Sequence, residues 1–173
     1  AGPPNLVALE TASLSFAPAT WDQPQTVTVR ALDNQIDAPD AVVTLSHGLA
    51  SGDPFYNGLA VAPLAVTVAD DDVAGVLIAP EALELAEGEA GQAYEVRLTS
   101  EPLAAVLVTL VPDGQLEVAP TTLTFTPANW NLAQAAVVTA IDDLVDEDGD
   151  ANASPHAGAV AHSVTSADAT YQG

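Results

Sequence analysis

Apolar and polar residues alternate with a period of two along much of this chain, and proline and glycine cluster between the alternating runs. Thr26–Val29 and Tyr94–Leu98 show the alternation most clearly. This period is typical of β-strands with one buried face, separated by turns. The expected strands lie near residues 6–9, 13–16, 25–31, 41–47 and 61–69, and then near 75–79, 82–86, 92–98, 105–111, 115–118, 122–125, 134–141 and 157–165.

A helix is the weaker interpretation in every part of the chain. The nearest candidate is Glu81–Ala90, which Pro80 would open, but Gly88 would end it after barely two turns. A helix that short is unstable on propensity alone, so a strand followed by a turn is favoured. Short strands at intervals of about 8–12 residues indicate antiparallel sandwiches. We therefore predict an all-β fold built of tandem antiparallel β-sandwich modules of the immunoglobulin-like kind.

One long segment occurs twice. Leu14–Trp21 recurs as Leu123–Trp130, at an offset of 109, and both tryptophans of the chain belong to this segment. Further on the offset is 115, which indicates an insertion of about six residues in the second copy. The pairs at this second offset are His47 with His162, Asp53 with Asp168, Tyr56 with Tyr171 and Gly58 with Gly173.

The repeat predicts about one and a half modules. Residues 1–72 match the later part of one module, and residues 73–173 match a second module without its last strand, the counterpart of Leu59–Val68. We expect the chain to be an interior slice of a longer polypeptide. Unpaired strand edges invite association. Neighbouring repeats, neighbouring copies, or Leu59–Val68 of the same chain would therefore complete the open edge.

The charge of the chain excludes several kinds of partner. It carries 24 acidic residues and 2 basic ones, for a formal charge of −22. Nucleic acid and anionic membrane surfaces are disfavoured, because both are bound through clustered lysine and arginine. No apolar run is long enough to insert in a membrane. The chain has no cysteine and so no disulfide; secreted modules without disulfides often need another staple, and a bound metal is a common one.

Three consecutive carboxylates, Asp70, Asp71 and Asp72, stand between the strand expected at 61–69 and the one at 75–79. They repel one another unless solvent or a cation neutralises them. Calcium takes six to eight oxygen ligands in flexible geometry. The segment therefore predicts a joint between two modules that calcium rigidifies; the alternative is a solvated turn, since aspartate is common in turns for backbone reasons.

Several motifs resemble the Calx-β family, and most closely the Calx-β-like tandem repeats of large bacterial surface and adhesin proteins. They are Glu87-Gly88 after a strand, Leu123–Trp130, the acidic run Asp142–Glu147, and Ser166–Gly173. The resemblance implies calcium ligands at Glu87, Asp142, Asp143 and Glu147, with Asp146 and Asp150 as further candidates. In the first module Asp33 and Asp37 take the equivalent positions, whereas Asn34 and Ala38 replace two ligands.

The other polar and aromatic residues give little sign of catalysis. Nucleophile-elbow, zinc-protease and phosphate-loop motifs do not occur in the sequence. His47 and His162 have no second ligand at zinc spacing, so we expect packing or hydrogen bonding. Trp21 and Trp130 are expected to plug a core or its rim, and a carbohydrate-stacking platform is the alternative.

The function expected from the sequence is therefore structural and not enzymatic. The chain would be a calcium-stiffened extender repeat of a long secreted or cell-surface bacterial protein, in contact with neighbouring repeats or copies. Two alternatives stay open. One is an adhesive module for glycan or protein, and the other is a filament subunit completed by strand exchange.

Overall fold

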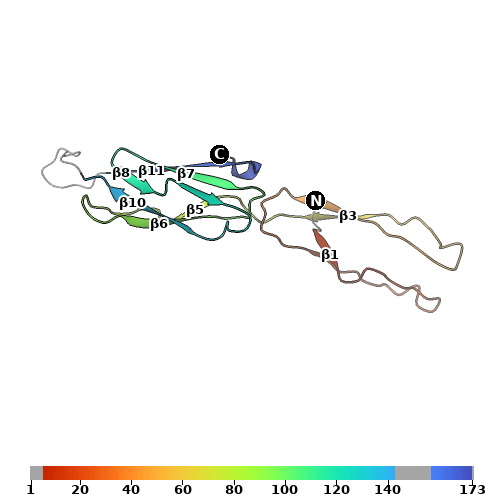
Figure 1. Cartoon of the computed structure of the whole chain (residues 1–173). Helices are drawn as coiled ribbons and strands as arrows, with labels where there is room; N and C mark the ends of the chain where they lie inside the picture. Colours follow the sequence, from red (N-terminus) through yellow and green to blue (C-terminus); the bar gives the residue numbers. More distant parts are fainter. Residues whose placement is uncertain (1–5, 143–156, 173) are drawn as a thin grey trace. The chain divides into compact units, whose positions relative to one another are not determined.

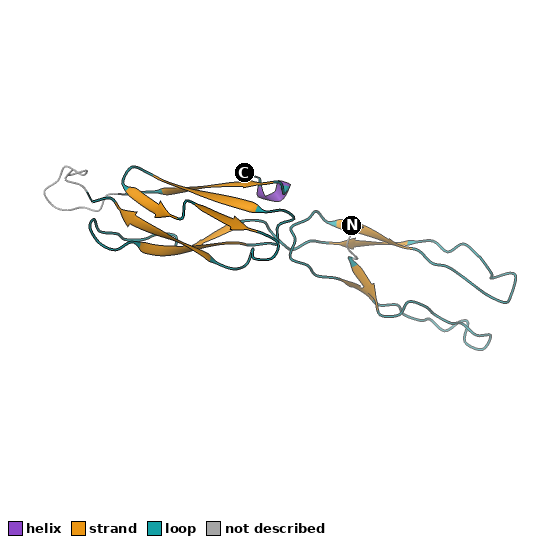
Figure 2. Ribbon diagram, in the orientation of Figure 1, coloured by secondary structure: helices purple, strands orange, loops and turns teal. Residues whose placement is uncertain are grey.

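The computed structural model describes residues 6–142 and 157–172. The fold is all-β, as predicted: antiparallel strands form several small sheets, and a 3₁₀ turn lies at Ala169–Tyr171 (Figure 2). The chain divides into two compact units. Unit 1 consists of Ala1–Asn34 and Ala38–Asp71, and unit 2 consists of Gln35–Asp37 and Asp72–Gly173.

Unit 1 contains two two-stranded sheets. Strand β1 (Val7–Leu9) pairs with β2 (Val29–Ala31), and β3 (Ala41–Leu45) pairs with β4 (Leu64–Val68). Two-stranded ribbons are marginal on their own, because each has little apolar surface to bury. No large apolar side chain of the described part of unit 1 is buried.

Unit 2 contains two larger sheets (Figure 1). The four-stranded sheet has the order β5-β6-β10-β8, and the three-stranded sheet has the order β11-β7-β9. The bounds of these strands are β5 Val76–Ala79, β6 Gln92–Leu98, β7 Val106–Pro112, β8 Leu116–Ala119, β9 Thr122–Phe125, β10 Gln134–Ala140 and β11 Val160–Ser166.

Alternate residues of both sheets in unit 2 form one apolar core. The largest of its fully buried side chains is Phe125 of β9, which has no exposed surface and stands opposite Val106 of β7. Leu98 and Val96 of β6 come from the other sheet and are also fully buried. Burial of this kind, at about 25 cal/mol per Å² of apolar surface, is the main stabilising term for such a unit. The core cluster is Tyr94, Val96, Leu98, Val106, Val108, Leu110, Val118, Leu123, Phe125, Ala136, Val138 and Tyr171.

A glycine permits the close approach of β6 and β10. A side-chain carbon added at Gly91 would lie 2.6 Å from the carbonyl oxygen of Val138, which is closer than atoms of a stable structure approach. The pairing of Gln92 with Val138 in the next position of the ladder depends on this contact. Gly91 is therefore required for β6 to begin where it does.

The sequence repeat reappears as repeated geometry. The β1–β2 pairing, Val7 with Ala31 and Leu9 with Val29, becomes the β8–β10 pairing when 109 is added to each number. In the loop between those strands, the Gln25 side chain donates to the Ser15 carbonyl over 2.8 Å. Gln134 donates to the Thr124 carbonyl, also over 2.8 Å. The two copies thus share register and local hydrogen bonds.

Two predicted strands, 13–16 and 82–86, are not strands. The first is the repeat counterpart of β9, which pairs with β7, and the described residues of unit 1 contain no counterpart of β7. The second is held by the Gln92 side chain, which donates to the Glu84 carbonyl, and it packs Leu83 and Leu85 against the core. In both places apolar and polar residues alternate, but the described residues supply no neighbouring strand with which the backbone could pair.

Two further strands are shorter than predicted. Residues 25–31 form a strand only at Val29–Ala31, and 61–69 only at Leu64–Val68. Residues 25–28 are not part of a strand, whereas their counterparts in the second copy, residues 134–137, pair with β6. Within unit 1, Leu64–Val68 of the segment Leu59–Val68 forms β4 and pairs with β3.

The same repeat positions differ in burial between the units. Phe125 is 0% exposed whereas its counterpart Phe16 is 52% exposed, and Trp130 packs against the core whereas Trp21 is 70% exposed. The difference follows from the missing strands, because the described residues of unit 1 contain no counterparts of β6 and β7. The prediction that the tryptophans plug a core is confirmed for Trp130 and wrong for Trp21.

Candidate functional site

Glu87 and Asp142 lie at one end of unit 2. Glu87 belongs to the turn before β6, and Asp142 follows β10, the antiparallel neighbour of β6. Between them, Gly88 adopts a φ of +71°, and a side-chain carbon added there would lie 3.7 Å from Asp142 Oδ2. Both carboxylates are exposed. The structure thus places the Gly88 turn, which follows Glu87, beside the Asp142 carboxylate.

The other candidates of this end, Asp143, Asp146, Glu147 and Asp150, lie outside the described residues. Within the described ranges no group of three or more histidine or acidic side chains is arranged to hold a metal. Calcium needs six to eight oxygens. Glu87 and Asp142 would therefore form only part of a site, and further ligands or water would have to supply the rest.

The acidic joint uses several of its carboxylates as backbone acceptors. In unit 1, Asp70 Oδ2 accepts from the Ala38 amide over 3.1 Å, and Asp40 Oδ1 accepts from the Asp70 amide over 3.0 Å. In unit 2, Asp37 Oδ2 accepts from the Ala74 amide over 2.7 Å. Charge-assisted bonds to backbone amides hold these turns directly. They give Asp37 and Asp70 a structural role without a metal.

The remaining joint candidates are distributed between exposed and half-buried positions. Asp33 and Asp71 are exposed, and Asp72 is half-buried. Asp33 and Asp71 belong to unit 1, and Asp72 belongs to unit 2. The joint is thus better described as a set of backbone-capping turns than as a formed cation site, and Glu87 with Asp142 is the stronger candidate.

A polar corner follows β11, and sequence reasoning assigned no role to it. Asp168 accepts from the Leu103 amide over 2.6 Å, from the Thr170 amide over 3.1 Å and from the Thr170 hydroxyl over 2.7 Å. Its own amide donates to Ser166 Oγ. The corner thus ties the end of β11 to the loop before β7. The recurrence of Ser, Asp and Tyr at an offset of 115 was the signal that could have revealed it.

The corner also sets the protonation of its carboxylate. Burial alone would raise the pKa of Asp168, but the hydrogen bonds from Leu103 and Thr170 outweigh burial and hold this pKa below its ordinary value of 3.8. The unfolded chain therefore binds the proton more readily than the folded chain. Stability from this group is present above the ordinary value and is lost as the pH falls through the folded-state pKa.

We expect Asp168→Asn to lower the free energy of unfolding by about 1–3 kcal/mol near neutral pH, because it weakens charge-assisted bonds from the Leu103 and Thr170 amides to a buried carboxylate. The difference in the free energy of unfolding between the variant and the parent protein should shrink as the pH falls below about 4, where the Asp168 carboxyl of the parent also becomes neutral. Denaturant unfolding of both proteins over a pH series measures it. Asp53→Asn, at the exposed repeat counterpart, is the control. A difference that stays constant with pH would contradict the role of the charge.

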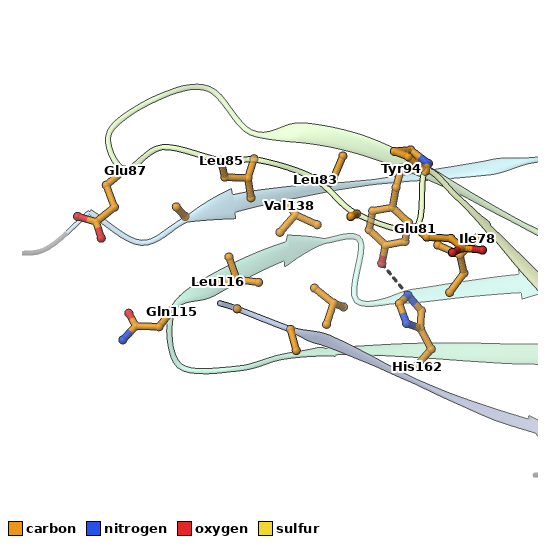
Figure 3. Close-up of a pocket in the computed structure, with 16 residues that line it drawn as sticks. Ile78, Glu81, Leu83, Leu85, Glu87, Tyr94, Gln115, Leu116, Val138 and His162 are labelled. Carbon is orange, nitrogen blue, oxygen red and sulfur yellow. Dashed lines mark hydrogen bonds between the residues drawn. The ribbon is translucent and has the colours of Figure 1, made fainter. Parts of the chain in front are cut away.

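Tyr94 and His162 meet across a hollow in unit 2 (Figure 3). The Tyr94 hydroxyl lies 2.9 Å from His162 Nε2, and the rings contact edge to face at 5.6 Å. Burial lowers the pKa of His162, against the opposite effect of a backbone hydrogen bond to Val160, and burial raises the pKa of Tyr94. A neutral ring whose Nε2 accepts from the tyrosine fits these directions. The hydrogen-bonding role predicted for His162 is therefore confirmed.

The chain was also compared with known proteins. In the described part of the chain no helix is long and apolar enough to cross a membrane. Comparison with protein-family models, with curated proteins and with solved structures found no match.

Proposed function

We propose that this chain is a non-catalytic structural repeat, built of Calx-β-like β-sandwich modules, and that it serves as an extender in a long secreted or cell-surface bacterial protein. The observation that carries the proposal is the repetition of register and hydrogen bonds at an offset of 109. Repeat arrays gain stability from contacts between neighbouring units, and they become longer when copies are added. The partners of this chain would accordingly be neighbouring repeats or copies.

An extender is favoured over an adhesive module by the setting of the tryptophans. Trp130 packs against the core of unit 2, so its ring is not a free platform for a sugar. Trp21 is exposed together with Leu14 and Phe16, and the counterparts of all three are core or core-packed residues in unit 2. The exposed face of unit 1 thus has the character of an uncovered core, not of a polar-rimmed binding site.

Calcium is the cofactor that we propose, at the end of unit 2 where the turn that holds Glu87 and Gly88 lies beside Asp142. Support comes from the Gly88 turn, which brings the backbone beside the Asp142 carboxylate, and from the formal charge of −22, which favours cation binding. A cation there would link the turn before β6 to the end of β10. Binding to the folded state alone stabilises that state by mass action.

Titration calorimetry on the whole chain tests this site. We expect calcium to bind with a dissociation constant of about 10⁻⁴ to 10⁻³ M, as in extracellular modules, and magnesium to bind more weakly. Glu87→Gln and Asp142→Asn should each weaken calcium binding at least several-fold. The matched control is Glu89→Gln, which removes one charge from the same exposed turn. Equal affinities for Glu87→Gln and Glu89→Gln would contradict a site at Glu87 and leave only diffuse attraction by charge.

A further inference from the structure

Strand β11 has one free edge in the described residues of unit 2. It is the terminal strand of the order β11-β7-β9, so only the edge toward β7 is paired. A free edge presents backbone donors and acceptors that a further strand can pair with. The inward-facing residues beside this edge are Val160, His162 and Val164, which are half-buried.

Two hollows lie on the inward side of the same strand. The larger, of about 480 Å³, is lined by Val160 and His162 of β11 and by Leu83, Leu85 and Leu116 from facing segments. The smaller, of about 170 Å³, is lined by Val164 of β11 and by Val76 of β5. Both therefore run between β11 and the segments at β5 and just after it. Figure 3 shows that Glu87 and Gln115 lie at one end of the larger hollow, away from the Tyr94–His162 pair.

Unit 1 shows what pairs with the counterpart of β11. At the offset of 115, β11 corresponds to residues 45–51 of unit 1, and the first of these, Leu45, is the last residue of β3 and pairs with Leu64 of β4. The ladder aligns Leu45 with Leu64, and it is extended by His47 Nδ1, which lies 3.0 Å from the Ala62 carbonyl oxygen. The pair Leu45–Leu64 and the side-chain contact of His47 with Ala62 place the segment before β4 beside the counterpart of β11, and the first of them gives a register to extend.

Transfer of this register to unit 2 gives a specific fit. Leu64 would stand opposite Val160, Ala62 opposite His162 and Ala60 opposite Val164. Directly opposed residues share one face of a sheet. The large Leu64 would therefore enter the larger hollow, and the small Ala60 would face the smaller one.

The charge and burial of the donor segment agree with this placement. Leu59–Val68 carries no ionisable side chain in a chain with 24 acidic residues, so it can approach unit 2 without adding repulsion. Leu64 is 51% exposed in its pairing with β3. Insertion between the sheets of unit 2 would remove this surface from water, which a two-stranded ribbon cannot do.

We propose that the free edge of β11 and its two hollows form an acceptor groove for the Leu59–Val68 strand of a second copy of this chain. The added strand would run antiparallel to β11, in the register of β3 and β4. Its backbone would supply the pairing, and its inward residues would supply the selectivity, as in other cases of strand addition. The inference does not depend on calcium binding.

Mixing two single-cysteine chains tests the proposal, because the chain has no cysteine of its own. Leu64→Cys in one chain and Val160→Cys in the other place the thiols on opposed residues, within the reach of a disulfide. Under mild oxidation we expect a heterodimer in which a disulfide joins these two introduced cysteines, identified by mass spectrometry. The control replaces Leu64→Cys with Ala65→Cys, whose side chain points to the opposite face of the strand.

A competing peptide sharpens the result. A synthetic peptide with the sequence of Leu59–Val68 should suppress the cross-link, and the same peptide with Leu64→Asp should not, because a carboxylate would be buried in the larger hollow. A cross-link no stronger with Leu64→Cys than with Ala65→Cys would overturn the proposal, and so would equal suppression by the two peptides. Strand donation within one chain would also give no heterodimer and would overturn it.

Discussion

Replacing Phe125 with alanine is expected to lower the free energy of unfolding of unit 2 by about 3–5 kcal/mol. Phe125 is fully buried in β9 and belongs to the core that both sheets share. The substitution removes a whole ring and leaves a cavity that a paired β-strand cannot collapse around, because Val106 holds the register opposite it. Denaturant unfolding followed by Trp130 fluorescence, in a Trp21→Phe background, reports on unit 2 alone.

The repeat supplies the matched control for this substitution. Phe16→Ala makes the same chemical change at the counterpart position, where the side chain is 52% exposed. We expect the unfolding of unit 2 to change by less than about 0.5 kcal/mol, the usual range for surface positions. Similar losses from Phe125→Ala and Phe16→Ala would contradict the assignment of the apolar core to unit 2.

Replacing Tyr171 with phenylalanine is expected to cost about 2–4 kcal/mol, a large effect for the loss of one oxygen atom. The buried hydroxyl donates to the Ser100 carbonyl over 2.7 Å, accepts from the Ser100 amide over 3.1 Å and lies 2.8 Å from Ser100 Oγ. Ser100 has no exposed surface, so its groups cannot turn to water when the hydroxyl is removed. The same unfolding measurement detects the loss.

Tyr56→Phe is the control for Tyr171→Phe. Tyr56 is the repeat counterpart, and 56% of it is exposed. The two substitutions delete the same atom from equivalent sequence positions, so the difference between them isolates the buried contacts with Ser100. A cost below about 0.5 kcal/mol for Tyr171→Phe would show that these bonds do not hold the end of β11 to the loop before β7.

The alternation of apolar residues predicted the strands best where the described residues supply at least one partner strand. The strands of unit 2 from β6 to β10 lie within one or two residues of the predicted ranges. Residues 13–16 and 82–86 carry the same alternation and are not strands. A period of two reports which face is apolar, but a strand also requires a partner for its backbone, and the partner lies elsewhere in the sequence.

Burial was harder to predict than strand position. Trp21 and Trp130 occupy equivalent places in the repeat, yet only Trp130 packs against the core. Local sequence is similar at both positions, and the presence of β6 and β7 in unit 2 decides the outcome. The repeat itself, in contrast, was fully readable from the sequence, because identical local hydrogen bonds require similar local residues.

The acidic candidates were only partly predictable. Clustering of aspartate in the sequence indicated cation binding, but Asp37 and Asp70 accept hydrogen bonds from backbone amides. Such turns arise from the backbone and are indistinguishable from metal loops by composition. The approach of the Gly88 turn to Asp142 depends on the pairing of β6 with β10, which no local pattern reveals.

Calorimetric melting of the whole chain tests most directly whether calcium stabilises it as a structural repeat. The scans compare chelator, magnesium and calcium at one ionic strength, so that screening of the −22 formal charge is held constant. At about one hundred times its dissociation constant, calcium should stabilise the folded state by about 2.7 kcal/mol. We predict a rise of several degrees in the melting temperature with calcium and a smaller one with magnesium. Identical melting temperatures in calcium and in chelator would contradict a stabilising role for calcium.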